Sequence, residues 1–254
     1  MLHSQLAHNE IDDSRTGSRT PVDVVAAHRG VLPWALGAIV LVVLAVLAHG
    51  AAQFPGDAGI VAFLKPIRGT VFAPVITFPS DVDSPVSGGI LAGAIITALA
   101  LLRRIIEAIT LAIWTFGTDL LDAIINGIVA RPRPHNVHVQ TISGLGSHSF
   151  PSGHVEHVTM FFGFLFFLTL LARAAHPERW AWLLPVQVVC VYFIAFIGIG
   201  RIVEGAHQPS DVLAGYLVGA LMLPLAIIFY RWLGAKWQRH QQRKHDEASL
   251  SRAR

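Results

Sequence analysis

The stretch GRIVEGAHQPSDVLAG, residues 200–215, lies between two long apolar runs and carries Arg201, His207 and Asp211 close together. A guanidinium holds anionic oxygens with its planar fork. An imidazole acts as a nucleophile or a proton carrier near neutral pH. Because Asp211 follows His207 by one helical turn, its carboxylate can hold the imidazole in one tautomer. The stretch alone allows two interpretations, an anion-binding site or a polar loop at the edge of a membrane.

The composition indicates a membrane protein. Of the 254 residues, 53% are hydrophobic and 14% are charged, and the mean hydropathy is +0.55. About a quarter of the residues of a soluble domain are charged. The net charge of +3 comes from basic residues that flank apolar runs without interleaved aromatics, which is typical of membrane orientation rather than of nucleic-acid binding. We therefore expect the membrane, and no nucleic acid, as a partner.

Six apolar runs each come near the length of roughly 20 residues that crosses a hydrocarbon core. Backbone polar groups find no water in lipid, so these runs must be helical. The sequence therefore predicts an all-α integral membrane bundle of six transmembrane helices. The predicted spans are residues 31–52, 86–102, 105–130, 155–172, 181–199 and 211–233.

Polar segments divide the chain further. Residues 1–30 predict a disordered cytoplasmic tail and residues 234–254 a basic cytoplasmic tail, which leaves residues 31–233 as the membrane domain. Prolines and charges interrupt residues 56–83. This segment predicts short interfacial helices rather than a span.

The basic residues also predict an orientation, because loops rich in Lys and Arg stay in the cytoplasm. Four basic places fall on one side of a six-span layout: Arg29, Arg103–Arg104, Arg173 with Arg179, and the C-terminal tail. The opposite side carries residues 53–85, 131–153 and 200–210. Basic residues kept there against the bias indicate a site, which we expect on the non-cytoplasmic face of the cell membrane.

Two further patterns lie on that predicted face. In ARPRPHN, residues 130–136, two prolines end the third span and aim Arg131 and Arg133 at the surface. FPSGHVEH, residues 150–157, begins the fourth span, where free N–H groups and the positive helix end favour an anion. Each pattern also has a plain structural interpretation, as a helix stop with snorkelling arginines and as a helix cap with an interfacial histidine.

Together the three segments supply what phosphoryl transfer without a metal needs. One histidine attacks phosphorus while a carboxylate orients it. Arginines and backbone N–H groups stabilise the phosphoryl oxygens, and a second histidine protonates the leaving oxygen. We therefore expect no cofactor and no bound metal.

The order Arg-Pro, then Pro-Ser-Gly-His, then Arg-x5-His-x3-Asp resembles the type 2 phosphatidic acid phosphatase superfamily of membrane lipid phosphatases. The motifs cover residues 126–215, and the six-span layout extends the resemblance over most of the chain. The resemblance implies that His207 is the nucleophile that forms a phosphohistidine and that Asp211 orients it. It implies that His154 is the general acid and later the base that activates water. The implied phosphate-binding groups are Arg133, Arg201, Ser152, the Gly153 backbone and, at the first motif position, Asn126.

Two positions depart from the family pattern. The first motif of the family begins with Lys, where this chain has Asn126, and the third begins with Ser, where it has Gly200. Loss of a donor at a developing charge costs about 3–4 kcal/mol, so both changes weaken the expected phosphate clamp. Our hypothesis is that Arg131 or Lys65 supplies the missing charge.

The sequence thus predicts a phosphatase for a lipid-linked phosphate or diphosphate, such as phosphatidic acid, phosphatidylglycerophosphate or an isoprenoid diphosphate. The alternatives are a catalytically weakened lipid-binding or transport protein of the same fold and, less in keeping with the spans, an oxidative vanadate-binding enzyme. Transporters carry their sites near the bilayer midplane, whereas the charges here gather at one interface. Asp119, Asp122 and Glu204 have two open interpretations, as a layer behind the site or as polar contacts between helices.

Overall fold

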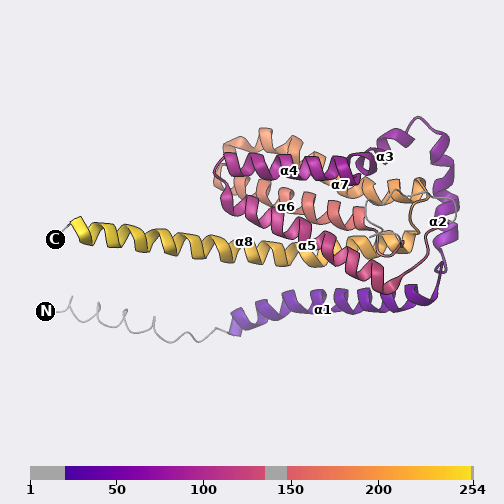
Figure 1. Ribbon diagram of the computed structural model, residues 1–254, viewed down its shortest axis with the longest axis horizontal. Coiled ribbons are helices and arrows are strands. Elements are labelled where there is room, and N and C mark those ends of the chain that lie inside the picture. Colours follow the sequence, from indigo (N-terminus) through magenta and orange to yellow (C-terminus); the bar gives the residue numbers. More distant parts are fainter. Residues whose placement is uncertain (1–20, 135–147, 253–254) are drawn as a thin grey trace. The chain divides into compact units, whose positions relative to one another are not determined.

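The computed structural model describes residues 21–134 and 148–252, and every regular element within those ranges is a helix (Figure 1). The predicted all-α architecture is confirmed. The residues up to Val40 form one unit and Leu41–Arg254 form a second. The elements are α1 (Pro21–Gly50), α2 (Asp57–Leu64), η1 (Lys65–Gly69), α3 (Ala73–Val82), α4 (Pro85–Leu101), α5 (Ile105–Val129), α6 (Gly153–Ala175), η2 (Pro177–Arg179), α7 (Trp180–Val203) and α8 (Pro209–Arg252).

Five of the described helices are long and apolar enough to cross a membrane, namely α1 from Val31, α5, α6, α7 and α8. The second predicted span corresponds to α4, which is apolar but has only 17 residues. The interrupted segment after α1 forms α2, η1 and α3, which bend by 103° at a short break. Counted as one broken span, this pair raises the total to six, so the predicted number of spans is the upper limit for the described residues.

Both ends of the predicted membrane domain are more helical than expected. Helix α1 begins at Pro21, well before the predicted start of the first span. Helix α8 continues to Arg252, and its residues beyond Gly234 are exposed as far as the structure describes them. That last segment is rich in Gln, Lys and Arg, which are good helix formers. Over the described residues, the predicted basic tail is therefore an exposed helical extension of α8.

Helix α6 is the centre of the second unit and packs against α5, α7 and α8. Glycines on α8 allow a close approach: a Cβ at Gly215 would lie 2.6 Å from the carbonyl oxygen of Ser152, and one at Gly219 would lie 2.6 Å from Cβ of Thr159. Small residues at such contacts are typical of helix pairs in membranes. The first turns of α6 and α8 are thereby held side by side.

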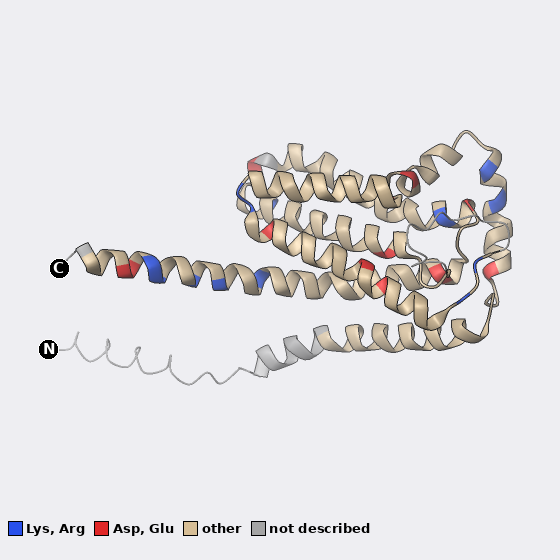
Figure 2. Cartoon of the chain, in the orientation of Figure 1, with Lys and Arg blue, Asp and Glu red and all other residues tan. Residues whose placement is uncertain are grey.

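Lys and Arg residues of this unit lie mainly towards the ends of the helices (Figure 2). At one end, Arg104 precedes α5 and Arg173 lies in the last turn of α6. The C-terminal end of α5, the N-terminal end of α6 and the turn from α7 to α8 lie at the opposite end (Figure 1). The three sequence motifs are therefore neighbours at one end of the bundle.

Candidate active site

His207 lies in the short turn between α7 and α8. The turn is made by Gly205, whose φ of 77° is the left-handed conformation that favours glycine. The N–H groups of Ala206 and His207 both donate to the carbonyl oxygen of Arg201, at 3.0 and 3.4 Å. The chain therefore doubles back over the end of α7, and His207 is only 2% exposed.

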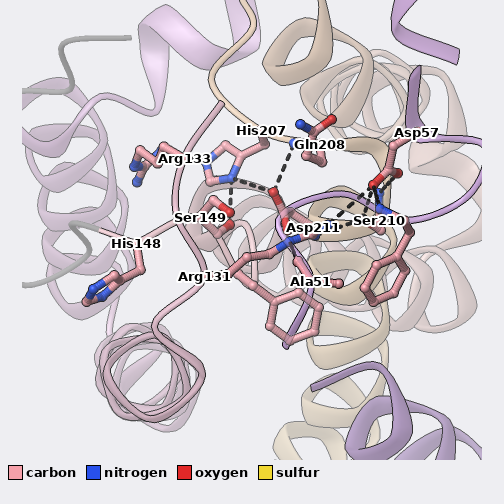
Figure 3. Close-up of polar contacts among 12 residues, drawn as sticks. Ala51, Asp57, Arg131, Arg133, His148, Ser149, His207, Gln208, Ser210 and Asp211 are labelled. Carbon is pink, nitrogen blue, oxygen red and sulfur yellow. Dashed lines mark hydrogen bonds and ion pairs between the residues drawn. The ribbon is translucent and has the colours of Figure 1, made fainter. Parts of the chain in front are cut away.

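The hydrogen bonds of His207 fix its tautomer (Figure 3). Its Nδ1 lies 2.8 Å from the carbonyl oxygen of Ser149. A carbonyl oxygen can only accept, so Nδ1 carries the proton and Nε2 keeps a lone pair. Asp211 is the neighbour that the spacing predicts, with Oδ2 at 3.9 Å from Nδ1 and a hydrogen bond of 2.9 Å from the N–H of Gln208. The nearer acceptor, Ser149, escaped the sequence analysis because a backbone carbonyl has no residue signature.

Arg133 reaches the other nitrogen of the ring. Its Nη1 lies 3.2 Å from Nε2 of His207 and donates to the carbonyl oxygen of Ala206 at 3.2 Å. Helix α5 ends at Val129, and the next residue, Ala130, has a positive φ of 50° that breaks the helical path before the two prolines. The guanidinium of Arg133 therefore donates to the ring nitrogen that carries the lone pair.

The surroundings of His207 favour its neutral form. Burial lowers the pKa of His207 well below its usual value, and the guanidinium groups of Arg201 and Arg133 lower it further. The structure thus places the guanidinium of Arg133 against Nε2 of His207 and the carbonyl oxygen of Arg201 against its backbone N–H group. That His154 belongs to the same site stays a prediction.

Two buried donors complete the arrangement. Ser152 occupies the N-cap position of α6 without a side-chain capping bond, and its Oγ has no hydrogen-bond partner among the described residues. Nε of Arg201 is likewise buried without a partner in the described part of the chain, while its Nη1 donates to Glu204 at 2.9 Å. An unpaired buried donor is costly, so both groups are suited to an anion at this helix end.

The structure gives a reason for glycine at position 153 that differs from the predicted one. A Cβ at this position would lie 2.7 Å from Oδ2 of Asp122 on α5. The glycine therefore makes room for a carboxylate of the protein itself. Its predicted role in letting a phosphate oxygen approach the backbone remains a prediction.

Asn126 contacts the protein backbone rather than the cluster around His207. Its Nδ2 donates to the carbonyl oxygens of His148 and Phe150, at 3.0 and 3.4 Å. Its Oδ1 accepts from the N–H of His148 at 3.2 Å. Both ends of the amide hold the segment that leads to Ser152, so these contacts do not support the prediction that Asn126 binds phosphate.

The other departure, Gly200, is explained by packing against α3. A Cβ at this position would lie 2.8 Å from the carbonyl oxygen of Ile76 and 3.0 Å from Oγ of Ser80. A serine would add a further atom at the same crowded contact. The close approach of α3 to α7 thus excludes the residue that the family usually has here.

The hypothesis about the missing charge is not supported for Arg131, which is fully buried and engaged with Asp57, Ser210 and Asp211. The same segment as Lys65 does contact the third motif, but through Arg68, whose Nε donates a hydrogen bond to the carbonyl oxygen of Val203.

Residues 135–147 of the second predicted outer segment lie outside the described residues.

A second polar cluster lies beside the site. Nδ1 of His157 contacts Oδ1 of Asp119 at 2.9 Å, and its Nε2 lies 3.8 Å from Oδ1 of Asp83. Burial is the main reason that the pKa of Asp83 is raised to about 7, and the charge of Asp119 adds to it. Asp119 is therefore a polar contact between helices, one of its two open interpretations.

The sequence profile of the PAP2 superfamily matches residues 102–235, more than half of the chain. The lipid A 1-phosphatase of Rhizobium johnstonii is 32% identical over 122 residues, which cover 45% of this chain and 44% of that protein. The decaprenylphosphoryl-5-phosphoribose phosphatase of Mycobacterium tuberculosis is 34% identical over 131 residues, 50% of this chain and 63% of that protein. The chain spans about half the length of these curated relatives.

A solved structure extends the likeness to the fold. The PAP2-type phosphatidylglycerolphosphate phosphatase of Bacillus subtilis superposes with a TM-score of 0.59, over 75% of this chain and 94% of that chain, at 20% sequence identity. At this identity the superposition shows a common fold alone. With the profile match over residues 102–235, it leads to one conclusion: the chain belongs to the PAP2 superfamily.

Proposed function

We propose that this protein is a membrane phosphatase that hydrolyses a lipid-linked phosphate or diphosphate through a phosphohistidine on His207. The observation that carries the proposal is the state of that imidazole. Its Nδ1–H is held by the Ser149 carbonyl, and its Nε2 faces the guanidinium of Arg133. A ring with its proton on Nδ1, a lone pair on Nε2 and a cation beside that lone pair is the arrangement that supports nucleophilic attack on a phosphoryl group.

In the first step the lone pair on Nε2 bonds to phosphorus and the bond from phosphorus to the leaving oxygen breaks. His154 gives that oxygen a proton. The ring of His207 is now positively charged, and the Ser149 carbonyl and the carboxylate of Asp211 face its Nδ1–H. In the second step His154 removes a proton from water, the oxygen attacks phosphorus, and the N–P bond breaks to release phosphate.

Positive charge from the protein stabilises both transition states. Arg133 and Arg201 supply guanidinium groups, and Ser152 supplies a hydroxyl at the positive end of α6. The chemistry therefore needs no step through a metal ion.

The substrate class follows from the setting of the site. The catalytic groups lie at one end of long apolar helices, so a lipid tail can stay in the bilayer while its phosphate enters among the three motifs. The two relatives described above act, by their names, on lipid A and on a decaprenyl-linked sugar phosphate. Phosphatidic acid, phosphatidylglycerophosphate and isoprenoid diphosphates are our candidates, met at the non-cytoplasmic face of the cell membrane.

The alternative is a binding or transport protein of the same fold with weakened catalysis. In the sequence, this alternative was supported by Asn126 and Gly200, the two departures from the family pattern. Asn126 holds backbone groups of residues 148–150, and Gly200 makes room for α3. Both departures thus have a structural explanation and do not argue for lost catalysis.

A phosphate-release assay on purified protein tests the proposal. The assay compares phosphatidic acid, phosphatidylglycerophosphate and an isoprenoid diphosphate in mixed micelles with EDTA present. We expect turnover of at least one lipid, and loss of at least about a thousandfold in His207→Ala and in His154→Ala. Asp246→Asn, at an exposed carboxylate near the end of α8, is the control. Turnover retained by His207→Ala would exclude the mechanism, and inactivity of the wild type on all lipids would favour the binding protein.

A further inference from the structure

Arg131 lies at the centre of a buried chain of charged groups (Figure 3). Its Nη1 donates to Oδ1 of Asp211 and, at 2.8 Å, to Oγ of Ser210. Its Nη2 lies 3.4 Å from Oδ2 of Asp57. Its Nε donates to the carbonyl oxygen of Ala51 at 3.0 Å. One guanidinium thus joins the carboxylate beside His207 to a carboxylate more than 150 positions earlier in the sequence.

Asp57 holds the start of α8 directly as well. Its Oδ1 accepts from the N–H of Ser210 at 2.9 Å, and its Oδ2 accepts from the Ser210 hydroxyl at 2.7 Å. The N–H of Phe54 also donates to Oδ2, at 2.8 Å. The residue before Asp211 is therefore fixed by three different contacts with Asp57 and Arg131.

Burial strongly favours these contacts, because the charged groups have no water to replace a lost partner. Arg131 and Asp211 are 0% exposed and Asp57 is 4% exposed. A buried charge without its partner is strongly unfavourable, so the three side chains can only adopt positions in which they pair. Arg131 is held further by the ring of Phe54, whose centroid lies 4.7 Å from the guanidinium carbon.

We propose that Asp57 is a positioning residue of the phosphoryl-transfer reaction, which acts through Arg131 and Ser210 on Asp211 and thereby on His207. The inference rests on the proposed function. Asp57 touches neither the phosphate-binding groups nor the attacking nitrogen. It fixes where the Asp211 carboxylate lies relative to Nδ1 of His207.

The position of the Asp211 carboxylate matters for the intermediate. Its Oδ2 lies 3.9 Å from Nδ1 of His207, and its charge stabilises the ring only once phosphorylation has made the ring positive. Without the Asp57 carboxylate, Arg131 and Ser210 lose the group that holds them in place, and the Asp211 carboxylate is no longer fixed beside the ring. The loss therefore appears in kcat, while KM for the lipid phosphate stays unchanged.

The test is a double-mutant cycle with Asp57→Asn and Asp211→Asn, measured as phosphate release by full-length protein in micelles. Asp57→Asn keeps the shape of the side chain and removes its charge. We expect it to lower kcat about tenfold at constant KM in the wild type, within the usual range of coupling between contacting residues. In the Asp211→Asn background we expect it to change kcat by less than about twofold. Asp246→Asn is the matched control in both backgrounds.

Two results would overturn the inference. One is an Asp57→Asn variant with wild-type kcat. The other is an equal loss in both backgrounds, which is what a purely structural role gives. If Asp57→Asn does not fold, Ser210→Ala replaces it, with an expected loss of about threefold that likewise disappears in the Asp211→Asn background. Turnover by His207→Ala contradicts the proposed function instead, so the two failures are distinguishable.

Discussion

Gly200 offers a test of the packing between α3 and α7, because it stands where the family usually has serine. We consider Gly200→Ala, which adds only a Cβ. In an open helical position such a change stabilises a helix by about 0.5–1 kcal/mol. At Gly200 the new atom would lie 2.8 Å from the backbone oxygen of Ile76, 3.0 Å from Oγ of Ser80 and 3.4 Å from Cα of Thr77.

The size of the effect follows from these distances. A backbone oxygen at 2.8 Å cannot move without moving α3, and overpacking of this kind costs about 1–3 kcal/mol. Subtracting the helix gain leaves a net destabilisation of about 1 kcal/mol. For a chain of this size that lowers the melting temperature by about 2–4 °C. Gly200→Ser adds a hydroxyl at the same contact and should be at least as unfavourable.

Thermal unfolding in detergent, followed by circular dichroism, measures this. Gly117→Ala on α5 is the matched control, because a Cβ added at Gly117 would meet no atom within 4 Å, and we expect its melting temperature to be unchanged or raised. A Gly200→Ala protein as stable as the Gly117→Ala protein would refute the account of the α3 contact. Higher turnover in Gly200→Ser would show that the missing serine limits the enzyme.

Three further predictions concern the site. Asn126→Ala should lower the stability by about 1–3 kcal/mol, because buried backbone groups at His148 and Phe150 lose their partner; a raised KM at unchanged melting temperature would instead indicate phosphate binding. Ser152→Ala should reduce kcat/KM by about 10- to 100-fold but change stability by less than about 0.5 kcal/mol, since its hydroxyl makes no capping bond; equal kcat/KM in mutant and wild type would remove Ser152 from the clamp. Because burial and neighbouring cations lower the pKa of His207, its ring should remain neutral as the pH falls through about 6.5, the usual pKa of histidine. NMR of nitrogen-labelled protein, with the His207 signal assigned by comparison with His207→Ala, measures this titration. A titration midpoint near about 6.5 for His207 would contradict the prediction.

The sequence predicted the site residues whose positions depend on the neighbouring chain. Asp211 follows His207 by one helical turn, and Ser152 and His154 were predicted because they stand where an apolar helix begins. Arg133 lies just beyond a helix end that prolines define. In each case local geometry places the side chain, and the membrane layout then brings the three motifs to one end of the bundle.

The sequence did not predict the contacts that depend on distant backbone. The Ser149 carbonyl lies 58 positions from His207, and Asp57 lies 153 positions from Ser210. No periodicity links such pairs, and a carbonyl oxygen belongs to any residue type. The motif spacing pointed to Arg133 rather than Arg131 as the phosphate-binding arginine, but the pairing of Arg131 with Asp57 depends on residues 74 positions apart and could not be read from the sequence.

The same limit applies to the two departures from the family pattern. Read alone, Asn126 and Gly200 indicated a weaker phosphate clamp. Each is instead explained by a neighbour that the sequence does not identify, the backbone of residues 148–150 for Asn126 and α3 for Gly200.

The central claim is that Nε2 of His207 takes the phosphoryl group from a lipid. The most direct measurement traps the intermediate: purified protein is mixed with a lipid phosphate labelled with radioactive phosphorus, quenched in alkali within one turnover, digested and mapped. We predict an acid-labile, alkali-stable label on the peptide that contains His207, absent from His207→Ala and retained by Asp246→Asn. Turnover without any labelled protein, or a label on a residue other than His207, would contradict the account.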